Sequence, residues 1–238
     1  MNRRDAGALL GTLLLAACGG GGGAGGSGEG DGVAAGASAS SPVLAALSPQ
    51  IALWGDSMVP PLARALAALL PGRAIHDGGV NGDTSMQVLE RLRAADPALR
   101  ERITFFWFGH NNIRLSGPQS AEQVKSDLVA AVDSLAPGNG AFIVLSLVNN
   151  AATGTAGTAE YDAIVRLNQD LAAAYPGHFF DIRRFMVDQA DPGTAQGEAD
   201  RRNDVPSSTL RADEIHLSGF GADVLARRLQ SLLQELGW

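Results

Sequence analysis

Four short groups of polar residues in this sequence could carry out the chemistry of acyl transfer. Gly-Asp-Ser at residues 55–57 and Asn-Gly-Asp-Thr-Ser at residues 81–85 each come shortly after an apolar run. Gly-His-Asn-Asn at residues 109–112 follows a third run, and Asp213 precedes His216 by three residues. Acyl transfer needs a nucleophile, a base, a group that orients the base and hydrogen-bond donors for the oxyanion. The four groups together contain a candidate for each of these roles.

Ser57, His216 and Asp213 are the candidates for the nucleophile, the base and the orienting acid. Ser57 comes at the start of a predicted helix, where free amides and the helix dipole favour negative charge. An imidazole such as that of His216 exchanges protons near neutral pH, and the spacing lets one turn present both Asp213 and His216. Each residue also has a simpler interpretation. Ser57 could only cap a helix, and the other two could be surface residues beside a helix entrance.

Five apolar runs alternate with amphipathic stretches, and these elements must position the polar groups. The runs cover residues 51–54, 74–77, 103–108, 141–148 and 178–182. Continuous runs of this kind are typical of strands that are covered on both faces. Helical spacing follows in three places: Val124, Leu128, Val132 and Leu135; Tyr161, Ile164, Val165 and Leu171; and, after Ser218 as N-cap, Phe220, Val224, Leu225, Leu229 and Leu232.

This alternation predicts the α/β class, with a three-layer α/β/α sandwich around a parallel five-stranded sheet. In such sheets the functional groups gather at the carboxyl ends of the strands. The first three polar groups follow predicted strands, and Asp213 and His216 precede the last predicted helix. Between the last strand and that pair we expect a long irregular segment at residues 183–211. The sequence therefore places all four groups at one edge of one sheet.

Taken in this order, the four groups resemble the sequence blocks of the SGNH (GDSL-type) hydrolases. The resemblance spans residues 54–238 and implies a flavodoxin-like SGNH hydrolase fold with esterase activity. It also implies a catalytic triad of Ser57, His216 and Asp213. Met58 stands where the family name has leucine, which is a volume-conserving change.

The same resemblance implies an oxyanion hole with three donors, the backbone amides of Ser57 and Gly82 and the side-chain amide of Asn111. The absence of a Cβ at Gly82 would let the chain approach the substrate closely. Asn111 could instead be a turn residue in an asparagine-rich loop. The sequence departs from the family's common G-x-N-D, because Asn112 replaces the aspartate. In addition, His110 is large and polar where the family often has a small residue. His110 and Asn112 are therefore candidates for contact with the substrate.

The amino-terminal end resembles that of a bacterial lipoprotein. Arg3 and Arg4 precede an apolar segment of twelve residues, whereas a membrane-spanning helix needs about 20. The segment closes with Leu-Ala-Ala-Cys, which resembles a lipobox, where the peptide is cut before Cys18 and the cysteine carries the lipid. An ordinary signal peptide with a chance cysteine is the alternative. We expect a signal peptide at residues 1–17 and a lipid-anchored protein of the cell envelope, on the outer side of the cytoplasmic membrane (periplasmic or outer-membrane).

Residues 18–42 are predicted to be the lipidated cysteine followed by a Gly/Ala/Ser-rich disordered tether. Eleven of the eighteen residues at positions 19–36 are glycine, so the segment buries too little apolar surface to offset its ordering entropy. Residues 43–238 then form the SGNH hydrolase domain. Cys18 is the only cysteine, which excludes an intrachain disulfide. The formal net charge of −7 argues against a nucleic-acid partner.

The expected function is serine-dependent hydrolysis of a carboxylic ester through an acyl-enzyme. We expect a short acyl group such as acetyl on a glycan, because a membrane tether would face polysaccharide and no long apolar lid is present. One alternative is a lipid or aryl-ester hydrolase, of the lysophospholipase or arylesterase kind. Another is a non-catalytic glycan-binding module of the same fold. We expect no metal or cofactor, since the remaining histidines and carboxylates lack ligand spacing.

Overall fold

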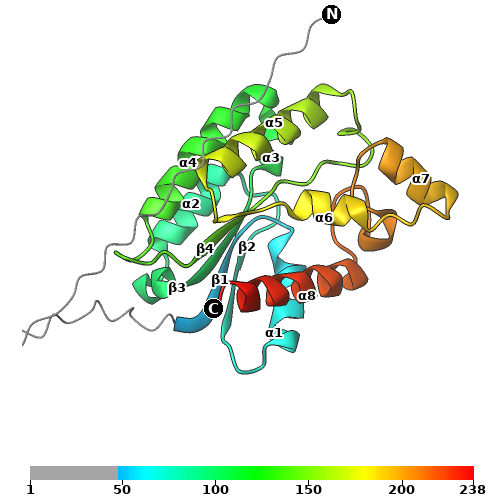
Figure 1. Cartoon of the computed structure of the whole chain (residues 1–238). Helices are drawn as coiled ribbons and strands as arrows, with labels where there is room; N and C mark the ends of the chain where they lie inside the picture. Colours follow the sequence, from blue (N-terminus) through cyan, green and yellow to red (C-terminus); the bar gives the residue numbers. More distant parts are fainter. Residues whose placement is uncertain (1–47) are drawn as a thin grey trace, which may run out of the picture. The chain divides into compact units, whose positions relative to one another are not determined.

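Five parallel strands form the central sheet of the computed structural model, which describes residues 48–238 (Figure 1). Their order is β2-β1-β3-β4-β5, the doubly wound order of flavodoxin-like proteins. The predicted α/β class and the parallel five-stranded sheet are confirmed. The predicted signal peptide, Cys18 and the tether lie outside the described residues. The strands are β1 (Ser48–Gly55), β2 (Ile75–Gly79), β3 (Arg102–Trp107), β4 (Phe142–Leu145) and β5 (Phe179–Phe180).

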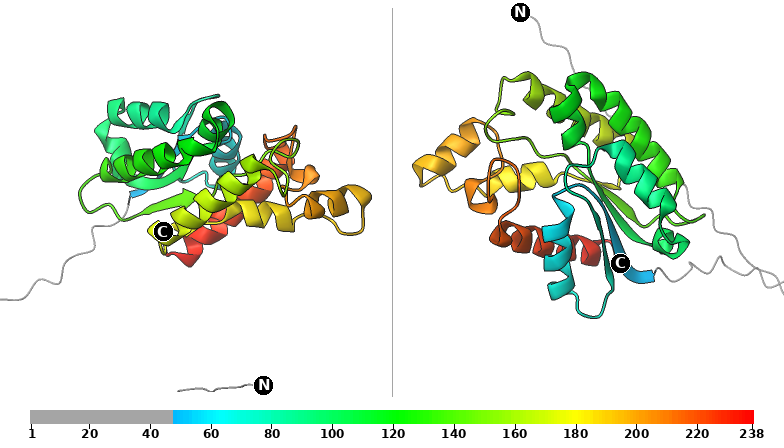
Figure 2. Two further views of the ribbon diagram at one scale, coloured as in Figure 1. Left: turned by 90° about the horizontal axis from the view of Figure 1, so that it is seen from above. Right: turned by 180° about the vertical axis from the view of Figure 1, so that it is seen from behind.

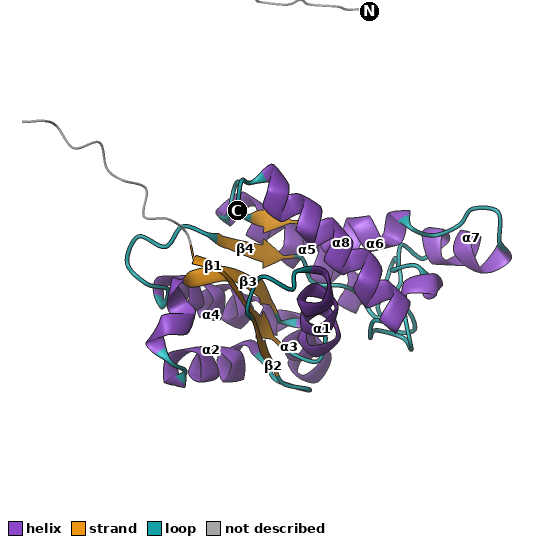
Figure 3. Cartoon of the chain, turned by 90° about the horizontal axis from the view of Figure 1, so that it is seen from below, coloured by secondary structure: helices purple, strands orange, loops and turns teal. Residues whose placement is uncertain are grey.

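Helices cover both faces of this sheet (Figures 2 and 3). Side chains alternate along β1, so Ile51 and Leu53 pack in one core with α1, α6 and α8. Ala52 and Trp54 pack in the other core with α2, α4 and α5. No helix among residues 48–238 is long and apolar enough to cross a membrane. The helices are α1 (Val59–Leu69), α2 (Ser85–Ala94), α3 (His110–Ser116), α4 (Ala121–Asp133), α5 (Ala159–Ala174), α6 (Ile182–Asp188), α7 (Ala195–Arg202), α8 (Gly219–Glu235) and the short 3₁₀ helices η1 (Pro97–Glu101), η2 (Pro118–Ser120) and η3 (Ser208–Leu210).

The register of the strands brings the carboxyl ends of β1, β2 and β3 level with one another. Gly55 at the end of β1 lies opposite Gly79 on β2 and Trp107 on β3. An added Cβ at Gly55 would lie 2.0 Å from the carbonyl oxygen of Trp107, so only glycine permits this approach. The loops that follow the three strands therefore begin side by side.

The strand predicted at residues 141–148 was too long, because β4 ends at Leu145. Beyond it the side-chain amide of Asn168 on α5 takes the place of a neighbouring strand. The Asn168 Oδ1 accepts from Leu147 N at 2.8 Å, and its Nδ2 donates to Leu147 O at 2.8 Å. Leu147 is thus bonded by a side chain and leaves the sheet.

The apolar stripe predicted for the last helix was wrong at its first position. Phe220 is 62% exposed, whereas Ala222, Leu225 and Leu229 are buried. The first turn of α8 is oriented by Gly221, which packs so closely on Leu210 that an added Cβ would lie 2.0 Å from its carbonyl oxygen. Phe220 precedes Gly221 by one residue, about 100° around the helix, and so points outward. The Ser218 N-cap is confirmed, since its side chain accepts from Gly221 N.

Candidate active site

Ser57 lies in the tight connection between β1 and α1. The strand ends at Gly55, and α1 begins at Val59 with two prolines in its first turn, where a missing N–H is harmless. Asp56 is buried, and its Oδ1 accepts a hydrogen bond from Met58 N at 3.1 Å. This bond fixes the turn, and Ser57 remains half-buried at the carboxyl edge of the sheet.

His216 and Asp213 come from the turn that precedes α8. The Nε2 of His216 lies 3.0 Å from Ser57 Oγ, although the two residues are 159 positions apart in the chain. The Nδ1 of His216 lies 2.7 Å from Asp213 Oδ2. A carboxylate only accepts, so Nδ1 carries the proton and the lone pair of Nε2 faces the serine hydroxyl. The three residues that the sequence singled out therefore form one hydrogen-bonded series.

The carboxylate of Asp213 is held by its own turn. Its Oδ1 accepts from His216 N at 2.8 Å and from Ile215 N at 2.9 Å. These bonds, with that from His216 N foremost, lower the pKa of Asp213 to about 2. The Asp213 side chain is 53% exposed, yet it stays ionised and pointed at the imidazole throughout the neutral range.

The three residues predicted to supply oxyanion donors, Ser57, Gly82 and Asn111, line the same cleft. The N–H groups of Ser57 and Gly82 have no acceptor among residues 48–238. Gly82 has a φ of +85°, a backbone conformation that residues with a Cβ rarely adopt. The buried Asn111 donates one Nδ2 proton to Asp83 O at 3.0 Å, which leaves its second proton for another acceptor. The three predicted oxyanion donors are thus unused or half-used in this structure.

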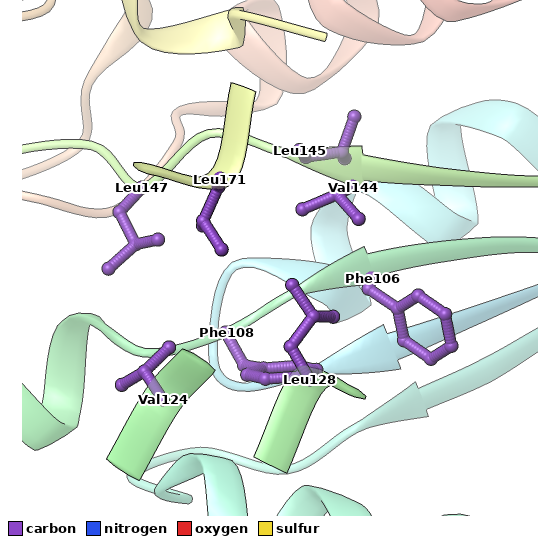
Figure 4. A pocket seen from close by; sticks show the side chains of 8 residues that line it. All are labelled: Phe106, Phe108, Val124, Leu128, Val144, Leu145, Leu147 and Leu171. Atoms are coloured by element: carbon purple, nitrogen blue, oxygen red, sulfur yellow. The ribbon is translucent and has the colours of Figure 1, made fainter. Parts of the chain in front are cut away.

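These groups border a cleft of about 500 Å³. A small, wholly apolar space of about 10 Å³ between the sheet and helices α4 and α5 is too small for a substrate (Figure 4). Ser57, Gly82, Asn111 and His216 line the cleft, and none of them lines the small apolar space. Its lining consists of Asp56, Ser57, Met58, Asn81, Gly82, His110, Asn111, Arg114, Ile215 and His216.

Asn112 does not line this cleft, which corrects the expectation that it could contact the substrate. It is buried, and its Oδ1 accepts from Ser85 N at 2.9 Å. Its Nδ2 donates to Ser85 Oγ at 2.9 Å, and that hydroxyl donates to Asp127 at 2.6 Å. Asn112 therefore joins α3 to the start of α2 and to α4. The carboxylate of this network is that of Asp127.

His110 lines the cleft, as the sequence suggested, but it is mostly buried. Its Nδ1 donates to Val148 O at 3.2 Å, so its Nε2 is an acceptor in the neutral ring. Burial is the main cause that lowers the pKa of His110. Its Nε2 has no hydrogen-bond partner in the described part of the chain. A contact between His110 and the substrate remains a prediction.

Sequence reasoning missed Arg91, which fastens the loop that carries Gly82. Its Nε donates to Asp83 Oδ2 at 2.7 Å, and its other two nitrogens donate to Gly78 O at 2.7 Å and Gly55 O at 3.0 Å. One guanidinium thus ties the ends of β1 and β2 to the loop that carries Gly82. Nothing in the local pattern marks Arg91, because its partners lie 8 to 36 residues away.

A doubly wound sandwich with a serine, histidine and aspartate in series at its carboxyl edge has the architecture of the SGNH-type ester hydrolases. The sequence model of the GDSL-like lipase/acylhydrolase family matches residues 30–224, which include all three residues. The chain belongs to this family and is an ester hydrolase.

Solved structures share the fold. A lipase/acylhydrolase from Enterococcus faecalis is 20% identical, with a TM-score of 0.59 over 78% of this chain and 95% of its own. An acetyl xylan esterase is 14% identical, with a TM-score of 0.60 over 77% of this chain and 99% of its own. A GDSL-like lipase from Bacteroides thetaiotaomicron is 16% identical, with a TM-score of 0.58 over 79% and 89%. Among curated proteins, no sequence matches this chain.

Proposed function

We propose that Ser57 is the nucleophile of this ester hydrolase and that His216 and Asp213 are its base and orienting acid. The observation that carries the proposal is the hydrogen-bonded series, 3.0 Å from serine to histidine and 2.7 Å from histidine to aspartate. A base within hydrogen-bond reach of a hydroxyl and itself oriented by a carboxylate is what activates a serine.

In the proposed reaction Ser57 Oγ attacks the ester carbonyl carbon while His216 Nε2 takes the hydroxyl proton. The negative charge moves to the carbonyl oxygen, where Ser57 N, Gly82 N and Asn111 Nδ2 donate to it. The C–O bond then breaks, and His216 returns the proton to the departing alcohol. A water molecule, deprotonated by His216, then attacks the carbonyl carbon of the acyl-enzyme. The bond to Ser57 Oγ breaks, His216 returns the proton to Ser57, and the acid is released.

The proposed substrate is a short acyl ester, an acetyl group carried by a glycan. The lining of the cleft supports this, because most of its side chains are polar and only Met58 and Ile215 are purely apolar. A short acyl group needs little apolar surface, whereas a long chain would need an apolar channel. The similar acetyl xylan esterase points in the same direction.

A lipid or aryl ester is the second candidate, since the name of the matching family includes lipases. Hydrolysis of p-nitrophenyl esters from acetate to palmitate distinguishes the two. The acetyl proposal expects kcat/KM to fall steadily with chain length and expects acetate release from acetylated xylan. A maximum at eight carbons or more would contradict it and favour the lipid ester.

Ser57→Ala tests the proposed mechanism. The substitution removes the hydroxyl but little packing, so we expect turnover to be lost while the melting temperature stays within a few degrees. A fluorophosphonate probe should label the wild-type protein and leave the variant unlabelled. Labelling of the variant, or activity that a chelator abolishes, would refute the role of Ser57. If neither the wild-type protein nor the variant hydrolysed any of these esters, the result would favour the non-catalytic glycan-binding module.

A further inference from the structure

Arg114 is a charged side chain in the cleft for which the proposed mechanism has no use. It lies on α3, three residues after Asn111, so both side chains are on the same side of the helix. One terminal nitrogen, Nη2, lies 3.5 Å from Asn111 Oδ1. Arg114 also lines the same cleft as Ser57 and His216, and it is exposed. A bound substrate can therefore reach the guanidinium beside the oxyanion donor.

No carboxylate among residues 48–238 pairs with Arg114. Arg91, which fastens the neighbouring loop, is by contrast bound to Asp83 at 2.7 Å. The one acid in the cleft lining is Asp56, which is only 3% exposed and bonded to Met58 N. Arg114 thus places a permanent positive charge in the exposed part of the cleft, and no carboxylate of residues 48–238 forms an ion pair with it.

A guanidinium in such a position matches a carboxylate, which it can bind through two parallel hydrogen bonds. Because Arg114 contacts Asn111, a bound anion would lie only a few atoms from the scissile ester. An acetyl group has no place for a charge, so the anion must belong to the alcohol part of the substrate.

We infer that Arg114 binds a carboxylate on the alcohol part and that the substrate is an acetyl ester of an acidic sugar. This inference rests on the proposed acetyl-esterase function and adds the class of the alcohol part to it. Arg114 then selects among esters by their charge, whereas Ser57 and His216 act on all of them.

Two acetyl esters of similar shape test the inference, 4-acetoxybenzoate with a carboxylate and 4-acetoxybenzamide without a charge. The quantity measured is the kcat/KM for the carboxylate ester divided by the kcat/KM for the amide ester. This ratio is compared between the wild type and Arg114→Gln, so that differences in intrinsic reactivity cancel. We expect the ratio to be about three- to tenfold higher in the wild type, as for a partly exposed ion pair. High salt should narrow this difference.

Arg227→Gln is the matched control, because Arg227 is an exposed arginine of α8 outside the cleft lining. It makes the same change in net charge and should keep the wild-type ratio. Arg114→Glu should lower the ratio below that of Arg114→Gln, since it repels the carboxylate.

Equal ratios in the wild type and Arg114→Gln would overturn the inference and leave the esterase proposal standing. A charge preference that follows Arg114 only for p-nitrophenyl hemisuccinate, whose carboxylate is on the acyl part, would also overturn it. If the wild type hydrolyses neither neutral nor charged esters, the esterase proposal itself fails.

Discussion

At the scale of single residues, Asn111 and Asn112 show how neighbours in the chain come to have different tasks. Asn111 lines the cleft and keeps one amide proton unused, whereas both ends of the Asn112 amide bind Ser85. Successive residues of a helix point about 100° apart, so one faces the cleft and the other faces α2. Substitution of each should therefore affect a different quantity.

Asn111→Ala is expected to lower kcat by about 10²–10³ and to leave KM within a few-fold. The reason is that a donor to the oxyanion is stronger in the transition state than in the ground state. The bond to Asp83 O is lost as well, which should reduce the free energy of unfolding by about 1 kcal/mol. Steady-state kinetics and urea unfolding of the variant measure the two effects.

Asn112→Ala is the control for that measurement. It leaves Ser85 N and part of the buried network without a partner, so we expect a loss of about 1–3 kcal/mol in stability. Its kcat should fall by less than about tenfold. If Asn112→Ala lowered kcat more than Asn111→Ala does, the oxyanion donor would be assigned to the wrong asparagine.

Asp56 predicts a pH dependence of stability. Burial raises its pKa from 3.8 to about 6, so the folded protein binds a proton that the unfolded chain has already released. The stability that Asp56 contributes is therefore present at low pH and is lost as the pH rises from 3.8 through about 6. Asp56→Asn keeps the acceptor for Met58 N and lacks the titration. Relative to the wild type, the variant should gain on the order of 1 kcal/mol between pH 5 and pH 8 in urea unfolding. An equal pH dependence in both proteins would contradict the raised pKa.

The triad residues could be predicted because their types and spacing are local signals. Asp213 and His216 are three residues apart, and Ser57 comes two residues after the end of a strand. Arg91 and the Asn112 network could not, since their hydrogen-bond partners lie 8 to 42 residues away. Arg114 could not either, since the cleft that it lines is formed mostly by residues far away in the chain.

At the scale of elements, the packing of α1 against α8 holds Ser57 beside His216. The first helix begins two residues after Ser57, and the last begins three residues after His216. The turn that carries Asp213 and His216 is held in place by an ion pair between Arg211 and Asp200. Arg211, with 9% of its side chain exposed, binds the buried Asp200 of α7 at 3.2 Å and donates to Asp213 O at 3.1 Å.

Arg211→Met is expected to destabilise the protein by about 3–5 kcal/mol, because it leaves the Asp200 carboxylate buried without its cation. The turn should also loosen, so kcat should fall. Asp200→Leu combined with Arg211→Met removes both charges and should recover part of the stability, but not the bond to Asp213 O. Thermal unfolding and kinetics of the single and double variants test this. Stability unchanged in Arg211→Met would show that the pair does not brace the turn.

The strands could be predicted because short continuous apolar runs are typical of buried strands in a parallel sheet. The expected irregular segment at residues 183–211 in fact contains most of α6, all of α7 and η3. Helices α6 and α7 have only seven and eight residues, too few for a clear periodic signal. The end of β4 depends on Asn168, whose role no local pattern could reveal.

At the scale of the whole molecule, the lipid anchor remains a prediction from the sequence. Cys18→Ser should yield a protein that stays in the soluble fraction after a salt wash, because the acylated residue is gone. Its kcat/KM on soluble esters should equal that of the wild type, since a long glycine-rich tether would separate anchor and site. Fractionation of membranes from producing cells provides the measurement. A variant that still sediments with the membranes would refute the lipobox.

The separation of 159 residues between Ser57 and His216 also has a consequence for protein synthesis. A ribosome completes Ser57, all five strands and the loop that carries Gly82 before it reaches His216. Until α8 is made, the apolar face of α1 lacks the partner that covers it in the finished protein. In the nascent chain, docking of α8 is therefore the step that both covers this face of α1 and brings His216 to Ser57.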